Sequence, residues 1–346
     1  MFNPYDIAQV QFTKLREIGH DGKNSQTFIA TDHQLGADIV VKEIPKARLI
    51  SPANFFDESR ALYASLHPNV VQLHYACQNA DSVFIAMPFY ARGSVKPLIT
   101  GAHLTVRQIV TLGCQTLSGL HNIHSKGLIH FDIKPDNIMI SDRGEALVSD
   151  FGLAKQMVGG IASPTSFYTS TIPPEALNGQ TAFDLTFDIY QFGLTLYRMA
   201  NGEGEFRRQW NHYATSGSFN AGAFTADVKA GRFPDRKRFP PHVPPRLRKI
   251  IVKCLSVVPT DRYASAIDTA NALALIEGSV LDWLLTEAGG TRIWTKNEMG
   301  TKIVLSVDAH GTADCRKQIG AGPERRVTSM CGRASDADIA KFLANN

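Results

Sequence analysis

Short apolar runs rich in β-branched residues dominate residues 11–88 of the chain. The runs at 39–42 and 83–87 predict strands, because such residues fit the pleated, half-buried surface of a sheet. After residue 104 the pattern changes to longer apolar repeats at helical spacing. These repeats predict helices over 106–126, 185–199 and 247–255. The pattern therefore predicts a small strand-rich part followed by a larger helical part.

One helix is expected inside the strand-rich part. Phe55, Leu62 and Leu66 lie at helical spacing and form an apolar stripe. Ser51 is a suitable N-cap before Pro52, because proline is tolerated in the first turn of a helix. The small part should thus combine several strands with a single helix.

The pattern changes a second time after Glu277. The pair Gly289-Gly290 is typical of a linker, and the segments beyond it alternate as strands do. The expected strands are 302–307, 313–319 and 325–330. Residues 308–311 contain a glycine and suit a hairpin loop. Ser335 is expected to cap a terminal helix over residues 336–343.

The composition is that of an ordinary globular protein. The chain has 346 residues, of which 44% are apolar and 20% charged, and this excludes disordered, collagen-like and coiled-coil chains. The length predicts about two domains. The 36 basic and 32 acidic residues give a net charge of +4, which is too mild to indicate nucleic-acid binding.

The cysteines and the lack of targeting segments bear on the compartment. Five cysteines are scattered without a C-x-x-C pair, so we expect reduced thiols rather than a disulfide framework or a zinc site. The first residues show no signal peptide, and no apolar run approaches the roughly eighteen residues that span a bilayer. The sequence thus indicates a soluble, cytoplasmic protein without a membrane span.

Two motifs in the helical part carry the candidate chemistry. Residues 130–137 are His-Phe-Asp-Ile-Lys-Pro-Asp-Asn, and residues 150–152 are Asp-Phe-Gly. With both motifs in this order, the chain resembles the protein kinase family, in its serine/threonine branch, along residues 12–275. The two motifs together make a chance match a weak alternative.

The resemblance implies an α+β protein kinase fold with two lobes. Residues 1–285 would form the kinase domain, with a small antiparallel β N-lobe with one helix (about 1–88) and a large helical C-lobe (about 89–285). Residues 286–346 would form a small β-rich C-terminal module with a terminal helix, whose role the sequence does not indicate.

The resemblance also implies a mechanism, in which a hydroxyl is placed in line with the γ-phosphate of ATP. Asp132 would accept the hydroxyl proton, and Lys134 would contact the γ-phosphate. Asn137 and Asp150 would each supply an oxygen to Mg²⁺, which keeps phosphate and water oxygens as its other ligands. ATP and Mg²⁺, with Mn²⁺ as a substitute, are the expected cofactors, and a protein is the expected acceptor.

Further residues match the family's phosphate-binding elements. Lys42 resembles the strand lysine that grips the α- and β-phosphates. Glu58 is the expected ion-pair partner of Lys42, and Asp57, one position round the helix, is the competing candidate. Gly19 and Gly22 belong to a phosphate-covering loop that keeps only two of the family's three glycines and is therefore degenerate.

The nucleotide base would bind at a hinge between the lobes. Met87 resembles the gatekeeper, and the Pro88 carbonyl and the Tyr90 N–H would meet the adenine edge. Pro88 has no backbone N–H, but this position needs only a carbonyl oxygen that accepts a hydrogen bond. Val40 and Met139 would lie on the two sides of the ring, and an assignment of both to the core alone is equally supported.

Three more residues resemble the architectural positions of a complete helical lobe. Glu175 ends the Pro-Pro-Glu segment, which stands where the family carries Ala-Pro-Glu. Arg262 is expected to pair with Glu175 inside the lobe. Asp188 resembles the aspartate that anchors the backbone of the catalytic loop.

The chain departs from the family in its activation segment, residues 150–175. Phe131 replaces the arginine that usually receives a phosphorylated activation loop, so we hypothesise that activity does not depend on that phosphorylation. The family's threonine before Pro-Pro-Glu is missing, and Thr169 is the candidate to replace it, one position late. The segment contains seven hydroxyl side chains, which favour autophosphorylation and a merely soluble loop about equally.

Two other classes of function stay as alternatives. The irregular glycine loop favours a pseudokinase that acts as a scaffold or nucleotide sensor. Such proteins usually lack at least one catalytic residue, however, and this chain has all of them: Lys42, Glu58, Asp132, Asn137 and Asp150. The third class is a small-molecule kinase of similar fold, although Lys134-Pro135-Asp136-Asn137 and the Pro-Pro-Glu segment favour protein substrates.

Two surface features have no assigned role. The basic runs 207–208 and 236–238 form either a solvated face or a docking patch for acidic or phosphorylated substrates. In the C-terminal module, Trp294 and Arg325-Arg326 could recognise a substrate, a partner or an activating ligand. The alternative is that Trp294 belongs to a small core and the module only supports the kinase domain.

Overall fold

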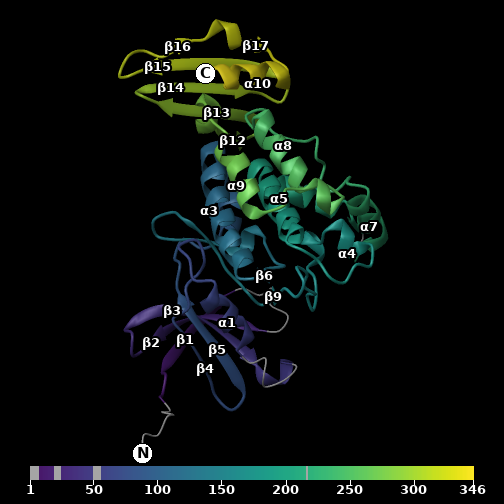
Figure 1. Ribbon diagram of the computed structural model, residues 1–346. Coiled ribbons are helices and arrows are strands. Elements are labelled where there is room, and N and C mark those ends of the chain that lie inside the picture. The colour runs from purple at the N-terminus through teal and green to yellow at the C-terminus, as the bar shows by residue number, and fades with distance from the viewer. Residues whose placement is uncertain (1–7, 19–24, 50–55, 216) are drawn as a thin grey trace, which may run out of the picture.

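The computed structural model describes residues 8–18, 25–49, 56–215 and 217–346. They form a strand-rich N-lobe, a helical C-lobe and a small module of strands and one helix (Figure 1). The N-lobe and the module lie at opposite ends of the C-lobe. The architecture is α+β, as expected from the sequence.

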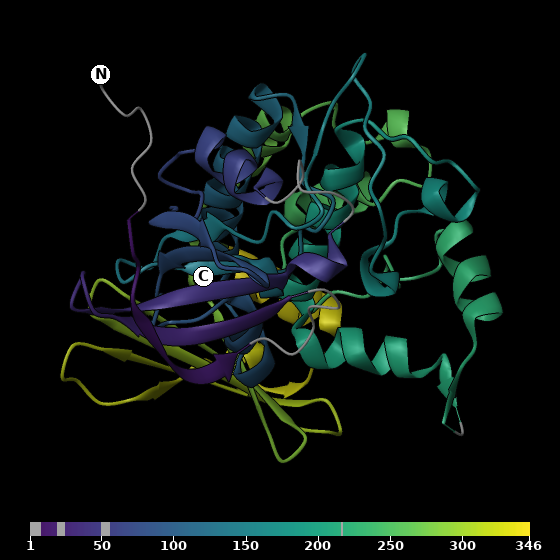
Figure 2. The same ribbon diagram turned by 90° about the horizontal axis from the view of Figure 1, so that it is seen from below.

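The N-lobe is a five-stranded antiparallel sheet in the order β1-β2-β3-β5-β4. It lies toward the viewer in Figure 2. The strands are β1 (Phe12–Ile18), β2 (Gln26–Asp32), β3 (Ala37–Pro45), β4 (Tyr75–Gln78) and β5 (Ser82–Pro88). The runs at 39–42 and 83–87 therefore form strands as predicted. Ala30, Ile39, Val41, Phe84 and Ala86 make the core of this sheet.

The α-helix predicted for the N-lobe ends earlier than its apolar stripe indicated. Its described part is α1 (Asp57–Ala64), and Ser51, Pro52 and Phe55 lie outside the described residues. Leu62 is buried, but Leu66 lies beyond the helix with 61% of its surface exposed, so its assignment to the stripe was wrong. The nearby Pro68 explains the early end, because proline and the residue before it resist helical geometry.

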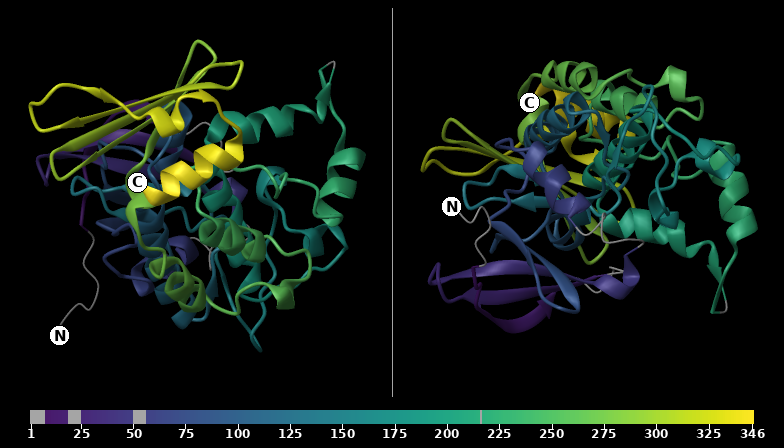
Figure 3. Two further views of the ribbon diagram at one scale, coloured as in Figure 1. Left: turned by 90° about the horizontal axis from the view of Figure 1, so that it is seen from above. Right: turned by 60° about the horizontal axis from the view of Figure 1, so that its bottom comes forward.

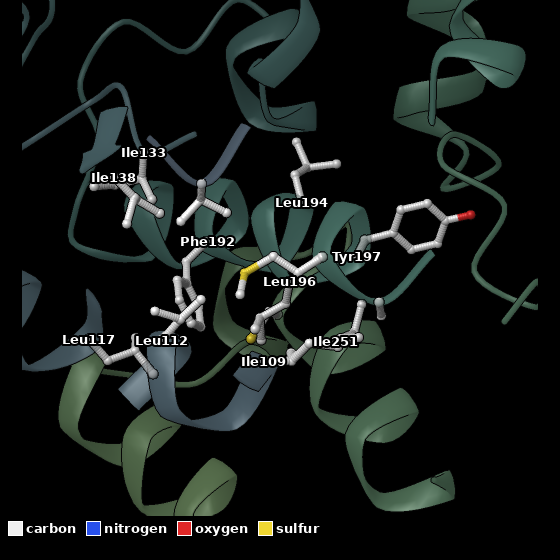
Figure 4. Packing of buried hydrophobic residues seen from close by; sticks show 14 of the residues in the cluster. Ile109, Leu112, Leu117, Ile133, Ile138, Phe192, Leu194, Leu196, Tyr197 and Ile251 are labelled. Carbon is white, nitrogen blue, oxygen red and sulfur yellow. The ribbon is translucent and has the colours of Figure 1, made fainter. Parts of the chain in front are cut away.

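The C-lobe is built from helices around one large core. They are α2 (Val95–Gly101), α3 (Val106–Ser125), α4 (Pro174–Leu177), α5 (Thr186–Asn201), α6 (Glu203–Asn211), α7 (Ala221–Lys229), α8 (Pro245–Cys254) and α9 (Ala266–Ala274). Ile109 and Leu112 of α3, Phe192 and Leu196 of α5, and Ile251 of α8 pack together in the core (Figure 4). A capping box of Thr105 and Gln108 fixes the start of α3. The three helices predicted from apolar repeats are confirmed.

Short strands on the C-lobe carry the functional loops. The pairs are β6 (Leu128–Ile129) with β9 (Lys155–Gln156), β7 (Ile138–Ile140) with β8 (Ala146–Val148), and β10 (Ala214–Thr215) with β11 (Ser218–Phe219). Strand β8 is tied to the N-lobe side by reciprocal bonds, from Val148 N–H to the Asn69 carbonyl and from Val71 N–H to the Val148 carbonyl (both 2.9 Å). This pairing places the residues that follow β8 beneath the N-lobe.

Gly119 allows α3 to pass directly under that connection. A Cβ atom at Gly119 would overlap the Asn69 carbonyl oxygen, which is backbone and cannot rotate away. We expect Gly119→Ala to lower the free energy of unfolding by about 1–3 kcal/mol, the usual cost of overpacking. Gly101→Ala, at a helical glycine with open space around it, is the matched control and should stabilise by up to about 1 kcal/mol. Denaturant unfolding of both variants checks this prediction, and equal effects would contradict it.

The C-terminal module is a six-stranded antiparallel sheet with one helix. The elements are β12 (Leu284–Ala288), β13 (Thr291–Glu298), β14 (Thr301–Val307), β15 (Thr312–Ile319), β16 (Arg325–Arg326), β17 (Gly332–Arg333) and α10 (Asp336–Asn345). Leu285, Trp294, Leu305 and Cys315 form one buried row across neighbouring strands. Figure 3 (left) shows α10 packed against this sheet, with Ile339 in the same core.

Two expectations for the module were wrong. Gly289-Gly290 is not a linker but the turn of the β12–β13 hairpin, where both glycines have positive φ angles of 57° and 80°. The strand expected over 325–330 stops after Arg326, because the chain turns into a 3-10 helix at Thr328–Met330. The hairpin around 308–311 and the Ser335-capped helix are confirmed.

The module is attached to the C-lobe by polar and buried contacts. Arg107 of α3 donates two hydrogen bonds to Asp282 (2.6 and 2.8 Å). The Trp294 indole N–H donates to His242 Nδ1 at 3.2 Å, and both side chains are fully buried. Burial lowers the pKa of His242 to about 3, so the ring is neutral and can accept. Trp294 is thus a core residue of the module rather than an exposed recognition residue.

Two further sequence expectations concern membranes and thiols. In the described part of the chain, none of the helices combines the length and the apolar character needed to cross a membrane. All five cysteines are free thiols, as expected from their spacing.

Candidate active site

A cavity of about 350 Å³ lies between the N-lobe and the C-lobe. It collects most of the residues singled out from the sequence: Val40, Lys42, Glu58, Met87, Pro88, Tyr90, Lys134, Asn137, Met139 and Asp150. These residues come from β3, α1, the end of β5 and the segment after it, the loop before β7, β7 itself, and the segment after β8. Gly19 and Gly22 lie outside the described residues.

The apolar part of the cavity lies on the hinge side. Val40 of β3 and Met139 of β7 are half-buried and line the cavity, and neither belongs to a buried core cluster. Met87, Pro88 and Tyr90 line it where β5 leaves the sheet. An apolar slot bordered by backbone of an extended segment suits a flat, planar ligand.

The charged part of the cavity is organised around Lys42. The Lys42 ammonium lies 2.6 Å from Glu58 Oε1 and 2.7 Å from Asp150 Oδ1. Asp57 is oriented elsewhere and pairs with Arg60 on the same helix at 3.5 Å. Glu58, and not Asp57, is therefore the helix partner of Lys42.

Burial and the two carboxylates act in opposite directions on these charges. Burial disfavours the charged form of Lys42, but Asp150 and Glu58 outweigh it and raise the pKa of Lys42 above its usual range. Burial also disfavours a charged Asp150, yet Lys42 holds the Asp150 pKa well below its usual range. Lys42 and Asp150 are thus a fixed ion pair at the centre of the cavity.

Asp132 lies on the C-lobe side, in the loop between β6 and β7. Its Oδ2 accepts hydrogen bonds from Lys134 (2.9 Å) and from the Asn137 amide (2.6 Å). Its Oδ1 is buried and has no hydrogen-bond partner among the described residues. A buried carboxylate oxygen without a donor is costly, so this atom keeps an unused capacity to accept a hydrogen bond. Asp132 itself is not among the residues that line the cavity, whereas its partners Lys134 and Asn137 are.

The environment also tunes the acidity of Asp132. Burial raises the pKa of Asp132 to about 6, Lys134 opposes the rise, and the negative charge of Asp150 adds to it. A carboxylate in this range is ionised at neutral pH and is a far better proton acceptor than an ordinary aspartate.

The loop that carries Asp132 is held by two buried polar residues of α5. Asp188 accepts hydrogen bonds from the His130 and Phe131 N–H groups (2.8 Å each) and from His124 (2.9 Å). Asp188 therefore anchors the loop as expected. Gln191 accepts from Ile133 N–H at 2.9 Å and donates to the Phe131 carbonyl at 3.0 Å. Sequence analysis missed Gln191, whose only signal is its position one helical turn after Asp188.

The base of the lobe contains the expected pair of Glu175 and Arg262. Arg262 donates two hydrogen bonds to the Glu175 carboxylate (2.8 and 2.6 Å), and both side chains are buried. Such a bidentate pair fixes the end of the activation segment to the C-lobe.

Phe131 replaces a charged contact by aromatic packing. It is almost fully buried, although its φ of +65° is strained for an aromatic residue. Its ring lies 4.9 Å from that of Phe187 and 6.2 Å from that of Phe183. Phe167 of the activation segment contacts the same two rings at 5.6 and 5.7 Å. An aromatic cluster thus joins the catalytic loop, the activation segment and α5.

The side chain that packs on Lys134 is Tyr168. The expectation that Thr169 takes the place of the family's threonine was therefore wrong. The Lys134 ammonium lies 3.6 Å from the centroid of the Tyr168 ring, and Tyr168 lines the cavity. Thr169 is exposed and begins the 3-10 turn Thr169–Thr171. A ring can hold an ammonium through a cation–π contact, so the expectation of a threonine at this place passed over Tyr168.

The oxygen donors at the cavity fit a magnesium ion. In the described part of the chain no cluster of three or more His, Cys, Asp or Glu side chains could enclose a metal by itself. Asp150 and Asn137 offer hard oxygens at one edge of the cavity, and the Asn137 amide turns its nitrogen toward Asp132. Two protein oxygens suit Mg²⁺, which keeps several water or phosphate ligands.

Comparisons with known proteins agree with this geometry. The model of the protein kinase domain matches residues 12–273. Serine/threonine-protein kinase PknA of Mycobacterium tuberculosis is 27% identical over 277 residues, which cover 76% of this chain and 61% of that protein. Serine/threonine-protein kinase PknK of Mycobacterium bovis is 26% identical over 279 residues, covering 78% of this chain and 24% of that protein. The chain thus spans less than two thirds of the length of both relatives.

Proposed function

The chain belongs to the protein kinase family, whose domain model covers residues 12–273, and from this premise we propose that it is an ATP-dependent serine/threonine protein kinase. The observation that carries the proposal is the buried Asp132 carboxylate. Its Oδ1 has no partner among the described residues, and its Oδ2 is bonded to Lys134 and Asn137, which both line the cavity. That arrangement suits a proton acceptor for an incoming hydroxyl.

The proposed reaction moves the γ-phosphoryl group of ATP to a serine or threonine hydroxyl. Asp132 accepts the proton as the hydroxyl oxygen bonds to the γ-phosphorus, and the bond from that phosphorus to ADP breaks. Lys134 compensates negative charge next to Asp132. Lys42, oriented by Glu58, would hold the α- and β-phosphates. Mg²⁺, which Asn137 and Asp150 would hold, neutralises charge on the phosphate oxygens when it is bound.

We propose that the adenine base occupies the apolar part of the cavity. Val40 and Met139 would contact its two faces, with Met87 behind it. The Pro88 carbonyl and the Tyr90 N–H would bind its edge. Gly19 and Gly22 are proposed to cover the phosphates, on the resemblance alone.

The proposal is tested by incubating the purified chain with γ-labelled ATP, Mg²⁺ and a generic protein substrate. We expect label on the substrate and on the chain itself, and none with the Asp132→Ala variant. Labelled free phosphate without labelled protein would contradict a protein kinase. Nucleotide binding without any transfer would favour the pseudokinase.

The pKa of Asp132 gives the proposal a pH dependence. Asp132 accepts a proton only when it is ionised, and burial raises its pKa to about 6. We therefore expect kcat/KM to be constant above pH 7 and to fall below pH 6, by about tenfold per unit. Initial rates between pH 5 and pH 8 with a peptide that does not titrate in this range check this. A rate that stays constant to pH 5 would show that Asp132 is not the proton acceptor.

We further propose that activity does not depend on activation-loop phosphorylation. Phe131 offers no cation to a phosphate there, and the aromatic contacts of Phe167 with Phe183 and Phe187 supply another way to order the segment. The segment could still be an autophosphorylation target, since it contains exposed hydroxyl side chains, among them Ser163, Thr165 and Ser166.

Replacing these hydroxyl side chains and Phe167 separates the two ways of ordering the segment. We expect the alanine variant of Ser163, Thr165, Ser166, Thr169 and Ser170 to keep its activity within about twofold. Phe167→Ala should lose about tenfold, because two aromatic contacts of about 0.5–1.5 kcal/mol each disappear. Val158→Ala, at an exposed apolar residue of the same segment, is the control. The proposal would be rejected if the hydroxyl variant lost its activity and the dephosphorylated wild type were inactive in the same way.

The division of the chain and its location are also proposals. Trp283 and Leu285 belong to the core of the module, which supports a boundary a few residues before 285/286. The five free thiols support a reducing compartment, and we propose the cytoplasm.

A further inference from the structure

Two basic runs that are far apart in the sequence meet on the surface of the C-lobe. Arg208 of α6 contacts Glu205 Oε1 at 2.6 Å, and Arg238 contacts the same oxygen at 3.2 Å. Gln209 donates a third bond to this oxygen at 2.7 Å. Lys237, next to Arg238, is exposed and has no ion pair within the described ranges. We call Arg208, Lys237 and Arg238 the basic cluster.

The basic cluster carries more positive charge than its surroundings neutralise. Its two arginines share the Glu205 carboxylate, and Lys237 has no ion pair among the described residues. With the nearby Asp235 included, three cations face two carboxylates, which leaves an excess of one positive charge. Asp235 is close by, and its carboxylate accepts the Lys237 N–H at 3.0 Å, but it does not line the groove next to the cluster. Arg236 is half-buried and turned away from this groove. The cluster is therefore a local site of unsatisfied positive charge.

The basic cluster forms one wall of a groove of about 900 Å³ between the C-lobe and the module. The C-lobe side consists of residues 99–103 at the end of α2, residues 201, 202, 204, 205 and 208 around the start of α6, and residues 237–241. The module side consists of β12, β13 and the first residue of α10. The volume lies at the upper end of the range of roughly 300–1,000 Å³ that is usual for ligand sites, and domain interfaces are their common location.

The module side of the groove has a different charge. Arg292 and Asp336 pair with each other at 2.9 Å and neutralise one another. Glu287 has no ion pair in the part that the structure describes, and it lies near His103. The groove thus has a positive end at the basic cluster and a negative side chain on the opposite wall. Half-buried Phe239 and Pro240 lie next to Arg238 and add apolar surface.

We propose that this groove is a docking site for an acidic segment of a protein substrate, a short peptide with neighbouring Asp or Glu residues beside apolar ones. The acidic residues would contact the basic cluster, and the apolar ones Phe239 and Pro240. A continuous polyanion such as a nucleic acid fits less well, because Glu287 would repel the phosphates that pass it. The choice of a substrate as the partner rests on the proposed kinase activity.

A chain of ion pairs connects the catalytic loop with elements that line the groove. Helix α6 begins at Glu203, whose carboxylate contacts Lys96 at 3.0 Å and Arg198 at 2.8 Å. Lys96 and Arg198 both approach Asp136, at 3.5 and 3.7 Å, and Asp136 lies four residues after Asp132. Helix α2 runs from this network to the groove and is seven residues long, or about 10 Å. A substrate can therefore dock by one segment while a nearby hydroxyl reaches Asp132.

Direct binding tests the site without any need for catalysis. The probe is a fluorescein-labelled peptide with four Glu followed by four apolar residues, titrated with the full chain and followed by anisotropy. We expect saturable binding that weakens with salt, and a loss of at least about tenfold in affinity for the double variant Lys237→Glu, Arg238→Glu. A peptide with four Lys in place of Glu should not bind.

The matched control is the double variant Lys302→Glu, Arg325→Glu. These two residues are exposed, have no ion pair in the described ranges, lie outside the groove, and undergo the same change in charge. It should bind the acidic peptide as the wild type does. Equal losses in both double variants would show a general charge effect and overturn the docking site. So would an oligonucleotide of equal charge that binds as well as the peptide and depends on the same two cations.

A kinetic test then separates docking from catalysis. A serine peptide that carries the acidic segment is compared with the same peptide without it. We expect the segment to lower KM by about tenfold at unchanged kcat, and Lys237→Glu, Arg238→Glu to abolish this difference while the untagged peptide reacts normally. An effect on kcat alone would contradict docking. If no peptide is phosphorylated but the binding result holds, the kinase proposal fails and the docking site stands.

Discussion

Replacing Asp132 by asparagine is expected to lower kcat by about 10²–10⁴-fold, the usual contribution of a positioned general base. The amide has the same shape as the carboxylate but cannot take a proton from the acceptor hydroxyl. The buried Oδ1 of Asp132, which has no partner among the described residues, is the atom whose basicity is lost. KM for ATP should change little, because Lys42 and the apolar part of the cavity are untouched.

The control for this variant is Asp142→Asn, at an exposed position outside the cavity. It should keep full activity. The folded state of Asp132→Asn should be at least as stable as the wild type, since the variant removes a buried charge that burial disfavours. Thermal unfolding beside steady-state kinetics checks both points. A fall of less than tenfold in kcat would exclude Asp132 as the base.

Replacing Lys42 by methionine is expected to lower kcat/KM by about 10²–10³-fold, the usual cost of losing one preorganised charge in an active site. The ammonium contacts Glu58 at 2.6 Å and Asp150 at 2.7 Å, so its loss removes the proposed phosphate contact and leaves two carboxylates side by side without a cation between them. The pKa of Glu58, which burial already raises, should rise further.

Lys14→Met provides the comparison, because Lys14 also pairs with a glutamate, Glu43, but lies outside the cavity. An exposed pair of this kind contributes little, and the variant should keep its activity. A Lys42→Met, Glu58→Gln double variant should be no worse than Lys42→Met alone, since Glu58 acts through Lys42. Additive losses would show that Glu58 has a separate role.

The residues proposed to carry the chemistry could be named from the sequence because they stand in two motifs that resemble those of protein kinases. Asp132, Lys134 and Asn137 lie within one short segment, and a loop of six residues can bring them together without help from the rest of the fold. In the structure, Lys134 and Asn137 both donate hydrogen bonds to Asp132 Oδ2.

The residues that sequence analysis missed depend on contacts between distant segments. The sequence shows that Phe131 stands where the family has an arginine. It does not show the aromatic contacts that Phe131 makes instead, because Phe167, Phe183 and Phe187 meet only in the folded chain. Gln191 likewise has no signal apart from its position on α5. A sequence motif therefore shows where the chain departs from the family, and the tertiary structure shows which contacts replace the missing ones.

Errors at the element boundaries have the same origin. Gly289-Gly290 has the composition of a linker, and the pairing of β12 with β13 makes it a tight turn. Leu66 fits a helical stripe by spacing alone, although the helix has already ended at Ala64. The docking role proposed for the basic runs at 207–208 and 236–238 likewise depends on a tertiary contact, because Arg208 and Arg238 meet at Glu205.

The central claim is that this chain transfers the γ-phosphoryl group of ATP to protein serine and threonine hydroxyls. The most direct measurement is mass spectrometry of three peptides, identical except for Ser, Thr or Tyr at the acceptor position, after incubation with the purified chain, ATP and Mg²⁺. We predict phosphorylation of the Ser and Thr peptides, little of the Tyr peptide, and none with Asp132→Asn. Unmodified Ser and Thr peptides, with ATP bound at the cavity, would contradict the account.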